Sequence, residues 1–435
     1  MNIASTPLRF PPLAGMTEGL SEHQLKGLQW TVGHAYSHSA FYRERLNAAG
    51  IRPEDIKSIG DIELLPFTTA EDLRNEYPFP LRAADFTDIV RIHSSSGTTG
   101  KRKILSYTQK DIDDWAYMFG RCYELAGVTR EDRVQICVGY GLWTAGVGFE
   151  LGCEKFGALA IPIGPGNMEL QCTFLVDMQA TVVCSTASMA LLLAEEVHRR
   201  GLQDKINLSK IILGAERTST AMENKIKELL RIEEVYDITG LTELYGPGTG
   251  LSCKYNNGVH YWADFYILEI LDPVTLKAVG PGEIGEMVFT TLRKEGAPLI
   301  RYRSRDLTRI VPDECPCGCL LPRHDKILGR SDDMFIVRGV NIYPGQIDEI
   351  LSGIKGAGSE YQLHLEHSSD GRDYMTLKVE REENIHESGD KGIAEVISKK
   401  LKNRLMVSSI VEIMPYGSLP RSEKKTRRVF DSRAY

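Results

Sequence analysis

The chain has 435 residues, and we expect two or three domains because a single hydrophobic core rarely grows beyond about 300 residues. Hydrophobic residues make up 42% and charged residues 26%, as in globular proteins, and no apolar run approaches the roughly 18 residues that span a bilayer, so we expect no membrane contact. The formal net charge of −7 argues against a nucleic-acid-binding protein, whose affinity would come from clustered basic charge.

The first 90 residues are predicted to be mostly helical. Residues 1–17 contain three prolines and no long apolar stretch, so we expect no secretory signal and a cytoplasmic location. Apolar residues follow a helical spacing over Leu20–Asn47. Thr69 precedes Glu71 and Asp72, which predicts a helix N-cap followed by an acidic first turn.

Residues 91–250 alternate short β-branched runs with helical stretches. The expected strands are 134–138, 158–163, 181–184 and 210–213, and the expected helices are 169–179, 188–200 and 220–230. This alternation predicts an α/β fold around a largely parallel sheet, with ligands bound at the strand ends.

Residues 251–330 have a different pattern, in which strand-like runs flank the turn at Gly280–Gly282 and predict an antiparallel β region. The turn-rich, charged segment 329–339 is typical of a domain boundary. We therefore expect a large N-terminal domain over 1–330 (helical 1–90, α/β 91–250, β-rich 251–330) and a small α+β domain over 331–435.

A string of small and hydroxylated residues is the sharpest local motif. It consists of Ser94, Ser95, Ser96, Gly97, Thr98, Thr99, Gly100 and Lys101. Its glycines permit tight backbone turns, its N–H groups and hydroxyls can surround phosphate oxygens, and its lysine adds positive charge. The spacing differs from the Walker pattern, which disfavours a P-loop ATPase. A flexible polar linker remains the alternative.

This string resembles the phosphate-binding loop of the adenylate-forming superfamily, which contains acyl-CoA synthetases. Further motifs of that superfamily follow in order at 236–243, 300–308, 329–334 and 419–425. The segments 65–73 and 140–144 and the Arg-Tyr-Arg-Ser-Arg-Asp string at 301–306 resemble phenylacetate–CoA ligases in detail. The resemblance spans nearly the whole chain, and it implies that the small C-terminal domain is mobile.

The resemblance implies an adenylation site. The string 94–101 would bind the phosphates of ATP, Glu243 would bind Mg²⁺, Thr242 would contact the α-phosphate and Asp306 would accept hydrogen bonds from the ribose hydroxyls. Other nucleotide-binding positions implied by the family are Ala215, Glu216, Asp237, Ile238, Thr239 and Arg330. The alternatives are a helix-start acid for Glu243 and a salt bridge to a neighbouring arginine for Asp306.

Lys425 is the expected catalytic lysine, which in this superfamily reaches the α-phosphate and the carboxylate. The preceding Leu-Pro-Arg-Ser-Glu favours Lys425, although Lys424 stands where relatives have glycine and keeps the choice between the two open. Asp332 resembles the hinge residue about which the small domain rotates. The sequence departs from the family at Thr239, where relatives often carry an aromatic residue that stacks on adenine.

A cysteine cluster suggests a metal site. Cys315 and Cys317 form a tight turn, and Cys253 and His260 would complete a closed, structural zinc site with four protein ligands. Some phenylacetate–CoA ligases carry a similar pattern. Cys319 could substitute for one ligand, and free surface thiols are the alternative.

Aromatic residues close to the glycine motifs suggest an apolar pocket for the acid, with core packing as the alternative. The candidates are Tyr140, Trp143, Tyr245 and Gly246. The function implied by the resemblance is an ATP-dependent acid–CoA ligase for phenylacetate or a related aryl acid, using Mg²⁺ and forming a homodimer. Two alternatives are an adenylating enzyme that loads a carrier-protein thiol and a regulatory nucleotide-binding protein without catalysis.

Overall fold

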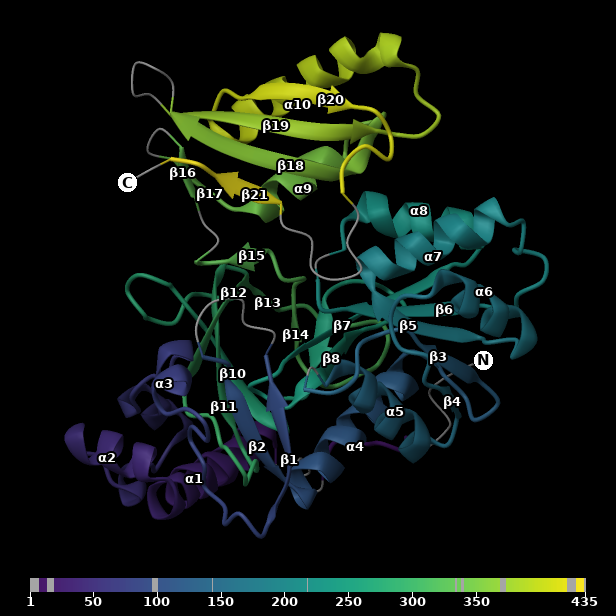
Figure 1. Cartoon of the computed structure of the whole chain (residues 1–435). Helices are drawn as coiled ribbons and strands as arrows, with labels where there is room; N and C mark the ends of the chain where they lie inside the picture. The colour runs from purple at the N-terminus through teal and green to yellow at the C-terminus, as the bar shows by residue number, and fades with distance from the viewer. Residues whose placement is uncertain are drawn as a thin grey trace. The chain divides into compact units, whose positions relative to one another are not determined.

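The computed structural model describes residues 8–13, 19–95, 101–142, 144–216, 218–332, 335–337, 340–367, 373–420 and 428–433 (Figure 1). The chain groups into two compact units. The first consists of Met1–Ser185, Lys205–Ala215 and Glu233–Lys326, and the second of Thr186–Asp204, Glu216–Ile232 and Ile327–Tyr435. The domain boundary at residue 330 stays a prediction. Within the described residues, no helix combines the length and apolar character of a membrane span.

The first unit begins with helices, as predicted. They are α1 (Leu20–His38), α2 (Ala40–Ala48), the 3₁₀ helices η3 (Pro53–Asp55) and η4 (Ile59–Leu64), and α3 (Ala70–Asn75). The helical pattern over Leu20–Asn47 is interrupted at Ser39, whose backbone is extended and whose carbonyl accepts the first bond of α2 from Arg43 N. The predicted N-cap is confirmed, because Thr69 Oγ1 accepts a hydrogen bond from Asp72 N at 3.3 Å.

A nine-stranded sheet forms the centre of the first unit, in the order β13-β14-β9-β8-β7-β6-β5-β3-β4. The strands are β3 (Arg133–Ile136), β4 (Leu159–Ile161), β5 (Val182–Thr186), β6 (Lys210–Gly214), β7 (Glu234–Leu241), β8 (Gly246–Ser252), β9 (Val259–Tyr261), β13 (Ile310–Val311) and β14 (Arg323–His324). Strand β3 pairs in parallel with β4 and β5, and β6 pairs in parallel with β7. From β7 to β13 the pairing is antiparallel.

Helix α5 (Ala145–Phe156) connects β3 to β4 and α6 (Met168–Asp177) connects β4 to β5, whereas α4 (Gln109–Leu125) precedes β3. Helix α4 packs on α5 and on β8. The approach is close because β8 is rich in glycine: a Cβ at Gly246 or Gly248 would lie 2.8 Å from the Trp115 ring or 2.7 Å from the Phe119 ring.

Two smaller groups of antiparallel strands complete the first unit. Strands β10 (Tyr266–Leu271), β11 (Gly285–Thr291) and β12 (Tyr302–Thr308) pair in sequence, which confirms the predicted antiparallel region. Strands β1 (Ile89–Ser94) and β2 (Ile104–Thr108) form a hairpin around the predicted phosphate loop. The α/β prediction for the large domain is therefore confirmed.

The second unit contains an α+β fold, as expected for the C-terminal part. Its helices are α7 (Ala187–Arg199), α8 (Thr220–Leu230), α9 (Pro344–Ser352), η5 (Glu387–Gly389) and α10 (Asp390–Leu405). Its strands are β15 (Gly329–Arg330), β16 (Phe335–Val337), β17 (Val340–Ile342), β18 (Ala357–His367), β19 (Asp373–Arg381), β20 (Ile410–Met414) and β21 (Val429–Asp431). The sheet β20-β19-β18-β21 packs its apolar face around Leu363 and Leu377, against Ile347 of α9 and Leu401 of α10.

Candidate active site

The motif at 236–243 occupies strand β7 and the turn that joins it to β8. Gly240 lies opposite Pro247 in this hairpin, and Leu241 lies opposite Gly246. A Cβ at Gly240 would lie 2.1 Å from the carbonyl oxygen of Gly246, so only glycine fits there. The two strands therefore close tightly and place Glu243 at the tip of the hairpin.

Glu243 is buried, with 5% of its surface exposed, and it is held as a carboxylate. Lys103 forms an ion pair with Glu243 Oε1, and the Tyr302 hydroxyl donates to the same oxygen at 3.0 Å. Burial by itself would raise the pKa of Glu243, but the charge and hydrogen bond of Lys103 lower it below its ordinary value. An ionised, oriented carboxylate is the kind of ligand that Mg²⁺ prefers.

Two of the predicted motifs meet at this carboxylate, together with a lysine that follows a third. Lys103 lies between β1 and β2 and follows the phosphate loop, Glu243 belongs to the β7–β8 hairpin, and Tyr302 belongs to β12. At the start of the loop, Ser94 N donates to the carbonyl of Leu142 and Ser95 N donates to that of Lys103. The structure thus brings segments about 140 and 60 residues away from Glu243 to one point.

Some predicted site residues lie outside the described part of the chain. They are Ser96, Gly97, Thr98, Thr99, Gly100, Trp143 and Lys425. At the C-terminal end of the phosphate loop, Lys101 Nζ lies 5.6 Å from the centre of the Tyr77 ring.

Asp306 lies on β12 and is 8% exposed. The arginines around it pair with other carboxylates, and the pairs are Arg301–Glu269, Arg303–Glu286, Arg305–Glu286 and Arg309–Asp325. Asp306 N donates to Ser304 Oγ at 3.0 Å, which fixes the local backbone.

The nucleotide-binding candidates in the second unit make local contacts. Arg330 is half-buried and Asp332 is exposed, and the two pair with each other through two bonds of 2.8 and 2.9 Å. Glu216 Oε1 accepts a hydrogen bond from Ser188 N at 2.5 Å. Burial raises the pKa of Glu216 above its ordinary value, and the bonds from Ser188 oppose that change.

The other predicted contacts to adenine and the acid lie in the first unit. Asp237 N donates to Ser252 Oγ at 2.8 Å, Ile238 is buried and Thr239 is half-buried. Ala215 follows β6 with a left-handed φ of 68°. Their positions at the end of β6 and along β7 agree with a ligand site at the carboxyl ends of parallel strands.

The candidate acid-binding residues have different degrees of burial. Tyr140 is half-buried with its ring against Gly146, whereas Tyr245 and Gly246 are buried. The hydroxyl oxygens of Tyr140 and Tyr245 are both buried and have no hydrogen-bond partner among the described residues. Burial raises the pKa of the Tyr140 hydroxyl, and the nearby Glu150 carboxylate raises it further.

The predicted metal ligands come together in the first unit. One ligand atom from each of Cys253, His260, Cys315 and Cys317 lies within 4.8 Å of the others. Cys253 Sγ is 3.5 Å from Cys315 Sγ, and Cys317 Sγ is 3.2 Å from His260 Nε2. His260 Nδ1 contacts the carbonyl of Leu321 at 2.9 Å, an outer bond that typically orients a metal-binding imidazole. Cys319 is not among the four.

Three residues that contact the Thr242–Glu243 turn were not identified from the sequence. Lys103 contacts the Glu243 carboxylate, Lys294 Nζ donates to the Glu243 carbonyl at 2.9 Å, and the Tyr107 hydroxyl donates to the Thr242 carbonyl at 2.8 Å. A fourth residue that contacts this turn, Tyr302, lies inside the motif at 300–308. Its place in that motif was the only sequence signal for its role.

Comparison with known proteins places this arrangement in a family. The AMP-binding enzyme family matches residues 31–291, and the AMP-binding enzyme C-terminal domain matches residues 339–433. The chain is 38% identical to phenylacetate-coenzyme A ligase of Pseudomonas putida, with 99% of this chain and 98% of that protein covered. It is 39% identical to phenylacetate-coenzyme A ligase of Escherichia coli (strain K12), with 94% of both covered.

A solved structure resembles the whole chain. The crystal structure of 2-hydroxyisobutyryl-CoA ligase in the postadenylation state, in complex with R3-HIB-AMP, superposes with a TM-score of 0.89 at 27% identity, covering 100% of this chain and 94% of that one. The chain therefore belongs to the AMP-binding enzyme family of adenylate-forming ligases. Within that family it is an ATP-dependent acid–CoA ligase of the AMP-forming type.

Proposed function

We propose that the acid is phenylacetate or a related aryl acid. A carboxylate oxygen attacks the α-phosphorus of ATP and the bond to pyrophosphate breaks; the coenzyme A sulfur then attacks the acyl carbon, and the bond to AMP breaks. The observation that carries the choice of acid is that four phenylacetate–CoA ligases are 36–39% identical over nearly the whole chain.

The residues around Glu243 support the first half-reaction. We assign metal binding to Glu243, α-phosphate contact to Thr242, ribose binding to Asp306 and phosphate binding to Ser94–Lys101. Mg²⁺, when bound, would neutralise charge on the phosphates. Glu243 suits this ion because its carboxylate is ionised and oriented by Tyr302.

A panel of acids tests the proposed substrate. Pyrophosphate release is measured with phenylacetate, benzoate, 2-hydroxyisobutyrate and acetate, each with and without coenzyme A. Phenylacetate should give the highest kcat/KM and consume coenzyme A stoichiometrically. A preference for a short aliphatic acid would contradict the aryl assignment.

The role of Glu243 is tested by a matched pair of variants, one in the turn after β7 and one at the start of that strand. Glu243→Gln removes the charge at the hairpin tip and should lower kcat/KM for Mg·ATP at least about 100-fold, because the loss of one well-placed electrostatic contact typically costs that much. Glu234→Gln removes an exposed carboxylate at the start of the same strand and should be neutral. Equal activity of the two variants would contradict the role of Glu243.

Lys425 and Asp332 are assigned by resemblance to the catalytic lysine and the hinge. Lys425→Ala should abolish adenylate formation but leave thioester synthesis from a supplied acyl-adenylate largely intact. Lys424→Ala should spare both steps. Equal loss of both half-reactions in the Lys425 variant would assign this lysine a different role.

The four clustered ligands fit a structural zinc ion. A tetrahedral ion with Zn–S bonds near 2.3 Å needs thiolates and an imidazole about as close as these atoms are. Four protein ligands leave no open position for catalysis, so the ion would stabilise the fold. Cys317→Ser should lower zinc content and thermal stability, whereas Cys319→Ser should change neither. Unchanged metal content in the Cys317 variant would refute this site.

The homodimer and the cytoplasmic location remain proposals that rest on family resemblance. Light scattering at micromolar concentration tests the first, and a mass of one chain, 48.6 kDa, would contradict it. Cell fractionation tests the second, and recovery outside the cytoplasmic fraction would contradict it.

A further inference from the structure

Lys294 is a fully buried lysine in the segment between β11 and β12. Its Nζ donates to the carbonyl of Glu243 at 2.9 Å and lies 3.3 Å from the Tyr107 hydroxyl, neither of which is a carboxylate. Burial of an amino group is costly when its partners are neutral. A neutral donor could satisfy a carbonyl at lower cost, so Lys294 requires an explanation beyond packing.

Lys294 supports the hairpin tip from the protein interior. Its partner Tyr107 also donates to the carbonyl of Thr242 at 2.8 Å, so two consecutive carbonyls of the turn are held by one linked pair of donors. The ring centres of Tyr107 and Tyr245 lie 4.3 and 5.4 Å from Lys294 Nζ, close enough to favour a cation there. Both the neutral amine and the ammonium carry N–H donors, so the contact can form in either state.

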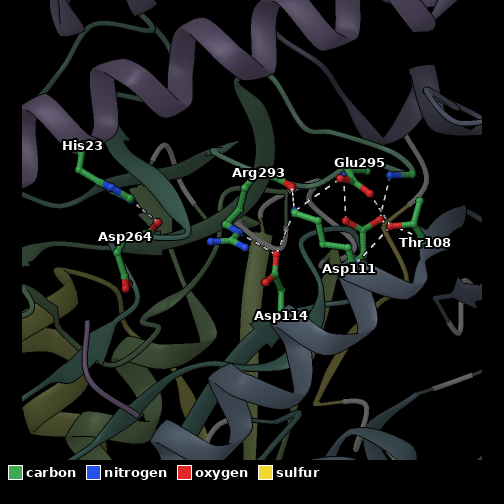
Figure 2. A network of polar contacts seen from close by, with 9 residues as sticks. His23, Thr108, Asp111, Asp114, Asp264, Arg293 and Glu295 are labelled. Carbon is green, nitrogen blue, oxygen red and sulfur yellow. Dashed lines mark hydrogen bonds and ion pairs between the residues drawn. The ribbon is translucent and has the colours of Figure 1, made fainter. Parts of the chain in front are cut away.

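The segment that carries Lys294 is anchored on its C-terminal side to the start of α4, as Figure 2 shows. The buried carboxylate of Asp111 accepts hydrogen bonds from the backbone N–H groups of Glu295 and Gly296, both at 2.8 Å. Thr108 Oγ1 donates to Glu295 Oε2 at 3.0 Å. A Cβ at Gly296 would lie 2.4 Å from the carbonyl oxygen of Ser106, so the backbone is also fixed by close contact.

The same segment is anchored on its N-terminal side to Lys110 and Asp114, in the first two turns of α4 (Figure 2). Lys110 Nζ donates to the carbonyl of Arg293 at 2.6 Å, and Arg293 Nε donates to Asp114 Oδ2 at 2.8 Å. Both neighbours of Lys294 are therefore fixed to one rigid helix. The position of the amino group is consequently well defined relative to the hairpin tip.

We propose that Lys294 is a positioning residue that fixes the main chain of Thr242 and Glu243 and so sets the direction in which the Glu243 carboxylate faces a metal-bound nucleotide. This inference rests on the proposed role of Glu243. The two lysines at Glu243 have different tasks. Lys103 is 18% exposed and binds the carboxylate itself, where a metal ion can replace it. Lys294 is inaccessible and holds the backbone whether or not the metal is bound.

Lys294→Met tests the proposal because it keeps most of the apolar stem and removes every donor. Lys210→Met is the matched control, since Lys210 pairs with Glu234 at the opposite end of β7. Pyrophosphate release is measured against Mg²⁺, ATP and acid concentration in turn. The Lys294 variant should need at least about tenfold more Mg²⁺ or lose at least about tenfold in kcat, because small misplacements of catalytic groups have large effects. Its KM for the acid should stay within about twofold.

The result that overturns the proposal is a folded Lys294→Met enzyme whose Mg²⁺ and ATP dependence matches wild type within about twofold. If that variant does not fold, Tyr107→Phe decides: it removes only the hydroxyl that links Lys294 to the Thr242 carbonyl, and an unchanged Mg²⁺ dependence overturns the proposal. The Mg²⁺ dependence of the wild-type enzyme separates a failure of the role of Glu243 from a failure of the role of Lys294. Release independent of Mg²⁺ in wild type would refute the role of Glu243 itself, whereas normal wild type with unaffected variants would refute only the role of Lys294.

Discussion

Arg121 and Asp264 form a buried ion pair that fixes α4 to the segment before β10. Arg121 Nη1 and Nη2 donate to the two carboxylate oxygens of Asp264 at 2.8 and 2.9 Å, and Asp264 is 0% exposed. Arg121 also donates to the carbonyls of Phe10 and Pro11. The backbone carbonyl of Asp264 contacts His23 of α1 (Figure 2). Four segments of the first unit thus meet at this pair: residues 10–11, α1, α4 and the segment before β10.

Arg121→Met should be strongly destabilising because it leaves the buried Asp264 carboxylate without its charged partner and with the Leu13 N–H as its remaining donor. Loss of one member of such a pair costs about 3–5 kcal/mol, which agrees with two charge-assisted hydrogen bonds at roughly 1.5–3 kcal/mol each. For the first unit, an unfolding entropy of about 2.1 cal/mol/K per residue means that a loss of about 4 kcal/mol lowers the melting temperature by roughly 5–8 °C. Differential scanning fluorimetry measures this change.

The double variant Arg121→Met/Asp264→Asn is the control, because it removes both charges together. It should recover at least half of the loss, since two neutral side chains avoid the penalty of an isolated buried charge. A single variant that melts within about 2 °C of wild type, or a double variant no more stable than the single one, would refute the reasoning.

Three further predictions concern the hairpin and its surroundings. Tyr302→Phe removes the hydroxyl bound to Glu243. In a Mg²⁺ titration of pyrophosphate release, the variant should need about 3–10-fold more Mg²⁺ for its half-maximal rate. Gly250→Ala places a Cβ 2.6 Å from the His260 carbonyl oxygen and should cost about 1–3 kcal/mol in urea unfolding; an unchanged midpoint contradicts this. Burial lowers the pKa of Lys294 to about 7 despite Asp111 and Glu243. Above that pH the unfolded chain binds the extra proton, so this residue's contribution to stability rises from pH 7 towards 10. Between about pH 7 and 10, the urea midpoint of wild type should rise relative to that of Lys294→Met. A difference between the two midpoints that stays constant with pH would contradict the lowered pKa.

The regular elements could be read from the sequence because their signals are local. The β-branched runs at 134–138 and 210–213 are strands within about two residues of the prediction, and 220–230 is a helix with the predicted ends. Thr69 was recognisable as an N-cap because its partner Asp72 is three residues away. The interruption at Ser39 was not, because serine is compatible with a helix and its burial depends on distant segments.

The contacts within the site were harder to predict because they join distant segments. Glu243 was found from its motif, but Lys103 and Lys294 are about 140 and 50 residues away in the chain. Lys294 stands in the charged string Arg293–Glu295, which reads as an exposed turn. Only the folded structure shows that the Asp111 carboxylate binds the backbone of this string and that the Lys294 side chain is fully buried.

The glycines of β8 have a consequence for how the site can be altered. Strand β8 lies against the rings of Trp115 and Phe119 with no space for another methyl group at Gly246 or Gly248. Larger residues at these two positions of β8 would therefore clash with the rings. New room has to come from smaller side chains in place of the Trp115 and Phe119 rings on α4, a helix outside the recognised motifs, so laboratory evolution that changes the shape of the hairpin should alter this helix.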